Sequence, residues 1–186
     1  MKDWNARVGA AIEAQEKKNW LEEIDQKPKL RTYKKLKKKL ELEDYIEQNR
    51  MSEGRRLLTA MRSGTNGLRI ETCRHYEWTI PEEERTCWCC GDQVENEQHF
   101  VVQCKHYRTE REEMFCMIEA VTEGRSKAEC LRSTQPEVLF NFLIGNGAQH
   151  KRAEVMKCVQ TFLVRATKSR KEFCKRAGIM PRSRGG

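Results

Sequence analysis

The sequence predicts a mainly helical fold with a small cysteine- and histidine-rich module embedded in it and room for one short β-hairpin. Apolar residues recur at helical spacing over long segments at both ends of the 186-residue chain. Leu, Ile, Val and Phe make up only about 19% of the residues, so the hydrophobic core is sparse and needs a further source of stability. Four of the nine cysteines fall between residues 87 and 104, where such a source could lie.

Residues 1–27 are predicted to form an N-terminal amphipathic helix. The helical pattern runs over residues 2–26, and Pro28 marks the break after it. Seven apolar side chains fall largely on one face of this helix: Trp4, Val8, Ala11, Ile12, Trp20, Leu21 and Ile24.

Residues 28–121 are expected to form a helical linker followed by the cysteine-rich module. Helices are predicted over residues 29–40, 42–50 and 53–62. A turn cluster with an Asn-Gly pair follows at residues 63–67, and the alternating pattern of residues 68–72 predicts a short strand. Helical periodicity returns near Glu97, inside the cysteine cluster, and continues to about Val121.

The remaining residues are predicted to form a polar linker, a helical pair and a basic tail. The linker covers residues 122–135, the pair 136–178 and the tail 179–186. Pro136 suits the first turn of a helix over 137–144, which ends at Gly145. A second helix is expected over 149–177. It carries an apolar stripe, typical of a core or of a dimer seam, at Val155, Val159, Phe162, Ala166 and Phe173.

Composition excludes several classes of protein. No run of about 20 apolar residues occurs, so no transmembrane span is predicted. The first residues form no apolar signal-peptide core, so we expect a nuclear or cytoplasmic protein that is not secreted. In that reducing setting, an odd number of cysteines argues against a disulfide framework and favours metal binding.

Four residues have the spacing of a metal site. Cys87, Cys90, His99 and Cys104 form the string C-x2-C-x8-H-x4-C. Two thiolates on a tight turn, with an imidazole and a thiolate from a short helical segment, can surround one tetrahedral Zn²⁺ ion. Because protein ligands fill all four positions, the site is closed and its single zinc ion is structural. Gly91, directly after the second cysteine, suits the sharp backbone reversal of such a turn.

Other interpretations of these residues stay open. The C-x2-C pair could be a redox pair, although no βαβ pattern surrounds it and His99 and Cys104 would then have no role. Cys89 or His106 could replace one of the four ligands. Further cysteines could simply be small buried residues. A structural zinc ion would contribute about 10–16 kcal/mol, which would compensate for the sparse core.

The four candidate ligands belong to a longer pattern. It reads R-x-G-x-x-x-L at 62–68, R-x-C-x-x-C at 85–90 and E-x-E-x-H-F at 95–100, and it ends with Cys104, Tyr107 and a following arginine, either Arg108 or Arg111. This pattern resembles the C-terminal CCHC zinc-binding region of non-LTR (LINE-type) retrotransposon polyproteins, downstream of the reverse transcriptase. The resemblance covers roughly residues 28–118. The sequence departs from it at Cys73, Cys89 and Lys105.

The resemblance implies binding to nucleic acid, either RNA or DNA. Two basic segments agree with this: 27–40 has eight basic residues and no acidic one, and 165–184 has eight basic residues and one acidic. Acidic residues flank the cysteines, so zinc is expected to hold the fold while neighbouring helices contact phosphate. Trp88 could either stack on a base or cap the zinc site. The candidate nucleic-acid contacts are Lys34, Lys35, Lys38, Arg55, Arg56, Arg62, Arg69, Arg74, Trp88 and Lys105.

No catalytic motif supports an enzyme. The sequence has no P-loop, no dinucleotide-binding glycine pattern, no HExxH and no paired-carboxylate motif, and no reverse transcriptase or endonuclease segment is present. We therefore expect neither enzymatic activity, nor a small-molecule substrate, nor a membrane partner. The alternatives to nucleic-acid binding are a zinc-stapled protein-interaction module, which dimerises through the last helix, and a non-functional retroelement remnant.

Overall fold

The computed structural model describes residues 2–37, 40, 46, 52–75, 80–145 and 151–179. These residues are mainly helical, as predicted, and no β-strand occurs among them. In place of a hairpin, these ranges contain one isolated antiparallel bridge, between Thr86 and Val94. The tail at 180–186, and the helix expected over 42–50 apart from Ile46, lie outside the described residues.

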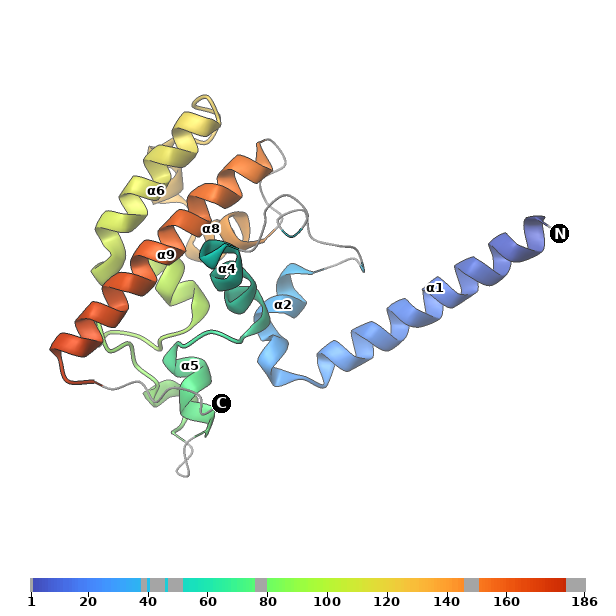
Figure 1. The fold of residues 1–186 in the computed structure, drawn as a ribbon, viewed down its shortest axis with the longest axis horizontal. Helices are drawn as coiled ribbons and strands as arrows, with labels where there is room; N and C mark the ends of the chain where they lie inside the picture. The colour runs from blue at the N-terminus through green and yellow to red at the C-terminus, as the bar shows by residue number, and fades with distance from the viewer. Residues whose placement is uncertain are drawn as a thin grey trace.

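Figure 1 shows the order of the helices along the chain. Short helical turns lie at Pro28–Leu30 (η1), Cys73–His75 (η2), Glu82–Glu84 (η3), His99–Gln103 (η4) and Lys105–Tyr107 (η5). The α-helices are α1 (Lys2–Asp25), α2 (Arg31–Leu36), α4 (Glu53–Ser63), α5 (Arg69–Thr72), α6 (Arg108–Val121), α7 (Ala128–Ser133), α8 (Pro136–Ile144) and α9 (Arg152–Arg176).

The long helix α9 forms the centre of the body, and α4, α6 and α8 pack against it (Figure 1). On its apolar stripe, Val155, Val159, Phe162 and Ala166 are each 0% exposed, while Phe173 is half-buried. The stripe is therefore the protein's own core.

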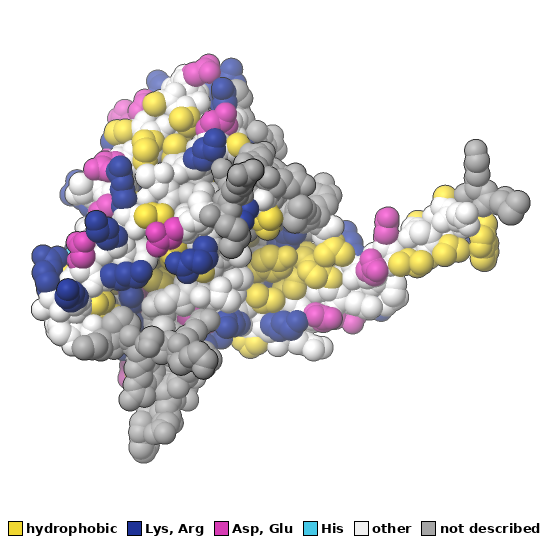
Figure 2. Space-filling view, in the orientation of Figure 1, with side chains coloured by type: hydrophobic (Ala, Val, Ile, Leu, Met, Phe, Trp, Pro, Cys, Tyr) yellow, Lys and Arg dark blue, Asp and Glu magenta, His cyan; other side chains and the backbone are white. Residues whose placement is uncertain are grey.

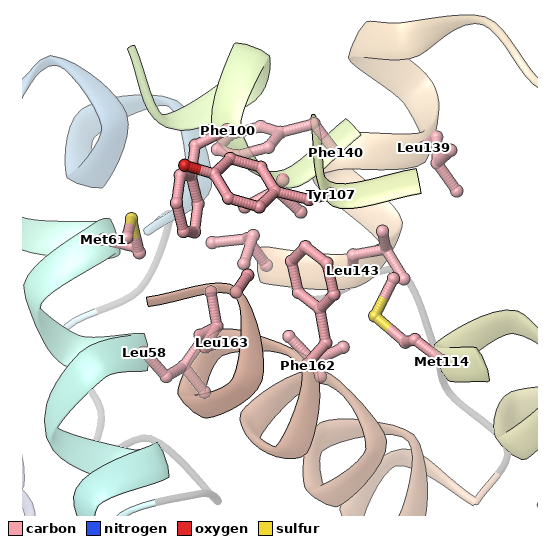
Figure 3. Close-up of a cluster of buried hydrophobic side chains, with 14 of the residues drawn as sticks. Leu58, Met61, Phe100, Tyr107, Met114, Leu139, Phe140, Leu143, Phe162 and Leu163 are labelled. Carbon is pink, nitrogen blue, oxygen red and sulfur yellow. The ribbon is translucent and has the colours of Figure 1, made fainter. Parts of the chain in front are cut away.

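An aromatic cluster joins the cysteine-rich module to this core (Figure 3). The rings of Phe100 and Tyr107, from the module, lie with centroids 4.7 Å apart. The Phe100 ring also lies 6.3 Å from that of Phe162 on α9. All three side chains are buried, and burial of each such side chain stabilises the fold by about 1.5–3 kcal/mol. The module is thus packed into the helical body and is not a separate appendage.

The N-terminal helix α1 was correctly predicted, but most of its apolar face is not covered. It projects away from the body as a long arm (Figure 1). Trp4 and Ile12 are 68% and 54% exposed. Only its end contacts the body, where Ile24 is buried and the ring of Trp20 meets that of Tyr33 edge-on at 6.4 Å.

The strand predicted at residues 68–72 is wrong, because these residues form the single helical turn α5. The Asn66 side chain accepts a hydrogen bond from the Leu68 backbone N–H at 3.0 Å, which starts the turn. Ile70 N–H donates to the Glu95 carbonyl at 3.1 Å. Leu68 and Ile70 are both buried. Their two-residue spacing is the alternating apolar pattern on which the strand prediction was based.

Two other predicted elements differ in extent. The helix expected over 29–40 consists of η1 and α2 and ends at Leu36, after which Lys37 has extended backbone angles (φ −92°, ψ 112°). The polar segment 122–135 is not only a connection, because it contains α7, whose Ala128 and Leu131 are buried in the core against α6.

Candidate metal centre

Cys87, Cys90, His99 and Cys104 come together as the sequence predicted. Their ligand atoms all lie within 4.8 Å of one another, so the cluster could hold a metal ion. The Cys87 and Cys104 sulfur atoms are 3.9 Å apart, and Cys90 Sγ lies 3.3 Å from His99 Nε2. Cys87, His99 and Cys104 are at most 2% exposed, and Cys90 is half-buried. An ion held here would be surrounded by protein.

A tight turn positions the first two cysteines. Gly91 N–H donates to the Cys87 carbonyl at 2.8 Å, and Cys87 N–H donates to the Gln93 carbonyl at 2.7 Å. Gly91 has a φ of +72°, a region that residues with a Cβ rarely adopt. The expected sharp reversal after Cys90 is therefore present, and it directs the sulfurs of Cys87 and Cys90 to one side of the cluster.

The helical turn η4 positions the other two ligands. The Asn96 side chain accepts a hydrogen bond from His99 N–H at 2.8 Å and so caps the turn. Cys104 N–H donates to the His99 carbonyl at 2.8 Å, and Cys104 then leaves the helical conformation (ψ 121°). This break in the predicted helix over 97–121 places the Cys104 sulfur beside the Cys87 sulfur.

The orientation of the histidine ring is fixed by a neighbouring amide. His99 Nδ1 lies 3.2 Å from Gln93 Oε1, so the Nδ1 hydrogen is donated to that oxygen. His99 Nε2, which faces Cys90, is then the nitrogen with a free lone pair. A metal-binding histidine typically donates its other ring N–H in this way.

The competing ligands Cys89 and His106 have other partners. Cys89 Sγ lies 3.2 Å from the Tyr107 hydroxyl group. His106 packs edge-on against the ring of Phe173 with centroids 5.2 Å apart, and its Nε2 lies 3.3 Å from Ser169 Oγ. Neither belongs to the group of atoms that could hold a metal.

Hydrogen bonding within the cluster makes its cysteines unequal. The contact with the Cys104 thiol lowers the pKa of Cys87 well below its ordinary value. The same contact raises the pKa of Cys104.

A buried ion pair links the cluster to α9. Arg170 donates from Nε and from one amino nitrogen to the two carboxylate oxygens of Glu95, at 2.7 and 2.8 Å. The Arg69 backbone N–H also donates to Glu95 at 2.9 Å. Burial alone would lower the pKa of Arg170, but Glu95 outweighs it and raises that pKa. Glu95 Oε1 lies 3.8 Å from Cys87 Sγ, so this pair is in contact with the candidate ligands.

A second buried network links the cluster to α2. Arg31 donates to both carboxylate oxygens of Glu97 at 2.8 Å and also pairs with Glu71. The Asn66 side chain donates to Glu97 at 2.8 Å. Burial would lower the pKa of Arg31, but Glu97 and Glu71 raise it. Glu95 and Glu97 therefore anchor the segment that precedes His99 to opposite parts of the body.

The other residues of the long sequence pattern also hold the fold. Arg62 is buried and donates to the Ile144 carbonyl at 2.9 Å. Gly64 has a φ of +62°, and a Cβ there would lie 2.1 Å from the Lys29 carbonyl oxygen. Arg111 donates to the carbonyls of Val101 and Cys104, both at 2.9 Å, whereas Arg108 is exposed. Arg111 therefore fits the structural position of the arginine that the sequence left ambiguous.

The structure distributes the candidate nucleic-acid contacts over exposed and covered positions. Two of the exposed lysines pair with acidic side chains, Lys34 with Asp25 and Lys105 with Asp92. Lys34, Lys35, Arg56 and Lys105 are exposed, Arg55, Arg69, Arg74 and Trp88 are half-buried, Arg62 is buried, and Lys38 lies outside the described residues.

Two of these candidates face the interior of the module. Arg62 is only 1% exposed, so it is in no position to reach a phosphate group, and we leave it out of the proposed surface. Trp88 lies under two guanidinium groups, those of Arg69 and Arg170, whose central carbons are 5.4 and 5.0 Å from its ring centroid. Its ring is half-buried and makes cation–π contacts with these two side chains.

Sequence reasoning missed Arg170 as a buried residue. Arg170 follows Ala166 by four positions, so it falls on the buried stripe of the last helix. An arginine on such a face requires a buried acidic partner. The place of Arg170 on the buried stripe could therefore have indicated, from the sequence alone, that it pairs with an acidic residue of the module.

Comparisons of the chain with protein-family models, with curated proteins and with solved structures gave no match. The resemblance to retrotransposon proteins therefore depends on the residues of this sequence alone. Among the described residues, none of the helices has the length and apolar character needed to cross a bilayer.

Proposed function

We propose that this chain is a nucleic-acid-binding module whose fold is stabilised by a zinc ion. It resembles the trailing domain of a non-LTR retroelement protein and has no polymerase or nuclease activity of its own. The observation that carries the proposal is the enclosed group of three cysteines and one histidine, which arises from the same pattern that carries the resemblance.

The donor set suits one structural Zn²⁺ ion. Three thiolates and one imidazole form a common tetrahedral set, with Zn–S distances near 2.3 Å. Two sulfurs on such an ion lie about 3.8 Å apart, close to the 3.9 Å between Cys87 and Cys104. All four positions are taken by protein atoms, which leaves none for water or substrate. Zinc in this site would stabilise the fold and would not catalyse a reaction.

Charge supports nucleic acid as the partner. The chain carries a formal net charge of +8. The acidic flank of the cysteine-rich turn is partly neutralised inside the protein, because Glu95 and Glu97 are buried against Arg170 and Arg31. The module therefore presents less negative charge to a phosphate backbone than its sequence indicates.

One observation favours a protein partner as the second candidate function. The outer half of α1 exposes Trp4, Val8 and Ile12 with nothing packed on them among the described residues. Large exposed apolar side chains along one face are typical of an interaction surface. The third candidate is a non-functional retroelement remnant. Such a remnant would bind specifically neither to nucleic acid nor to a protein partner.

The test measures binding of the reduced, zinc-loaded chain to labelled single-stranded RNA and to labelled duplex DNA across a salt series, with and without chelator. The proposal predicts steep salt dependence that disappears on chelation, because the apo chain would lose the fold that presents its basic residues. Weak, salt-independent binding near about 100 mM salt, where exposed charges are screened beyond about 10 Å, would contradict it.

A further inference from the structure

The solvent-facing side of α9 carries charge of almost one sign. Its exposed charged residues from position 157 onward include a single acid, Glu172. The first and last lysines of this face are 18 residues apart, which corresponds to about 27 Å along the helix. The basic members are Lys157, Arg165, Lys168, Lys171, Lys175 and Arg176. Figure 2 shows Lys and Arg side chains gathered over the part of the body where α9 ends.

Most of this charge is not used within the protein. Arg165 pairs with Glu113 of α6. In the part of the chain that the structure describes, the ammonium groups of Lys157, Lys168, Lys171 and Lys175 take part in no ion pair or hydrogen bond. Lys168, Lys171 and Lys175 lie close together along the helix with Glu172 as the one exposed acid among them, so an anionic surface would relieve the repulsion between these cations.

A groove between α4 and α9 continues this face. It has a volume of about 360 Å³ and is lined by Ser52, Gly54, Lys157, Gln160, Thr161 and Arg165. Gly54 lets the helices approach closely, since a Cβ there would lie 2.7 Å from that of Gln160. Gln160 is 7% exposed, and its side-chain nitrogen has no hydrogen-bond partner in the described ranges. The groove thus combines basic side chains at its rim with a buried polar side chain in its lining.

We propose that the exposed face of α9, together with the α4–α9 groove, binds the phosphate backbone of a nucleic-acid duplex. The inference rests on the proposed function and assigns it a surface and a form of nucleic acid. This surface lies outside residues 28–118, which carry the resemblance, except for the α4 side of the groove. Its members are also absent from the ten contacts that the sequence predicted.

The side chains on this face favour a duplex over other anionic partners. Binding of single strands generally uses exposed aromatic rings that stack on bases, but the aromatic residues of α9, Phe162 and Phe173, are buried or half-buried. Binding to a membrane surface requires bulky apolar residues beside the basic ones. Between the lysines, the uncharged side chains closest to the centre of this face are Thr161 and Val164, which are both half-buried. Such a surface can contact regularly spaced phosphates without reading bases.

The test compares two variants of the full, zinc-loaded chain, each lacking four lysine charges. One is K157Q/K168Q/K171Q/K175Q on α9. The matched control is K17Q/K18Q/K27Q/K127Q, which removes the same charge from exposed lysines that lie outside α9 and outside the ten candidate contacts. Binding to a labelled 20-base-pair DNA duplex is measured by fluorescence anisotropy across a salt series, with single strands and anionic lipid vesicles as further arms. Circular dichroism and zinc content check that both variants fold.

Loss of four phosphate contacts should reduce the slope of log K against log salt by about 3.6, since each contact contributes about 0.9. Affinity of the α9 variant for the duplex should fall at least about tenfold at low salt, whereas the control variant should bind nearly as the wild type does.

Several outcomes would overturn the inference. Loss of duplex binding in the control but not in the α9 variant, or an equal loss in both, would show that binding does not depend on the α9 face and would leave the proposed function standing. The duplex backbone would be excluded as the occupant if the wild-type chain bound single strands more tightly than the duplex. It would also be excluded if the α9 variant lost only its binding to vesicles. If the wild-type chain bound neither RNA nor DNA at any salt concentration, the proposed function itself would fail.

Discussion

Replacing Arg170 by methionine should strongly destabilise the protein, since it removes one partner of a buried ion pair. The side chains of Arg170 and Glu95 are 8% and 0% exposed, and two hydrogen bonds of 2.7 and 2.8 Å join them. Methionine replaces much of the arginine stem but carries no donor. The Glu95 carboxylate would then stay buried 3.8 Å from the Cys87 sulfur, without the cation that α9 supplies.

The expected loss follows from the cost of an unpaired buried charge. Breaking a buried ion pair by removing one partner typically costs about 3–5 kcal/mol. The whole free energy of unfolding of a domain is only about 5–15 kcal/mol. With an m value near 2 kcal/mol/M, the midpoint of urea unfolding of Arg170→Met should fall by about 1.5–2.5 M.

The assay is urea unfolding followed by circular dichroism at a fixed excess of zinc. Arg132→Met is the control, because Arg132 also pairs with a glutamate (Glu112, 2.6 Å), but these side chains are 46% and 37% exposed. Its midpoint should not change measurably. The double variant Glu95→Met/Arg170→Met should recover much of the loss, since no buried charge remains. An Arg170→Met midpoint no lower than that of the control would refute the reasoning.

Three further predictions concern the metal centre and its support. Cys104→Ser should lose bound metal and much of the helical signal, whereas Cys89→Ser should keep both, as measured by metal analysis and circular dichroism. Gln93→Ala should weaken metal binding about 10–100-fold in a competition titration with a chelator, because His99 loses the acceptor that orients its ring. Gly64→Ala should lower the thermal midpoint, because its Cβ would meet a backbone oxygen at 2.1 Å.

Each of these predictions has an outcome that contradicts it. Equal metal content in the two cysteine variants would mean that the set of four ligands was assigned incorrectly. Unchanged metal affinity on loss of the Gln93 amide would show that the ring is held by other contacts. For the glycine, Gly9→Ala is the matched control, because nothing lies within 4 Å of its Cβ position in α1. That variant should gain helicity, and a similar loss of stability in both would remove the steric argument.

The Cys/His cluster that could hold a metal ion was predictable from the sequence because its geometry is local. The four ligands lie within residues 87–104, and two short turns decide where their sulfur and nitrogen atoms point. The core stripe of α9 was predictable for the same reason, since helical periodicity within one segment defines a face. Patterns of this kind need no knowledge of distant parts of the chain.

The contacts that hold the module in the body could not be predicted in this way. The pair of Glu95 and Arg170 spans 75 positions, and that of Arg31 and Glu97 spans 66. The sequence marks these glutamates only as an acidic flank of the metal site. The strand predicted at 68–72 failed similarly, because the burial of Ile70 depends on packing and on a hydrogen bond to the Glu95 carbonyl.

The segment from Glu95 to His99 couples the metal site to the rest of the protein. Glu95 contacts α9, Glu97 contacts α2, and Asn96 between them caps the turn that carries His99. Without a metal ion to hold His99, this segment would lose its fixed backbone, and both buried ion pairs would lose the geometry that offsets their desolvation. The basic face of α9 would then depend on a metal ion with which it has no contact. Chelation should therefore abolish duplex binding even though no metal ligand contacts a phosphate group.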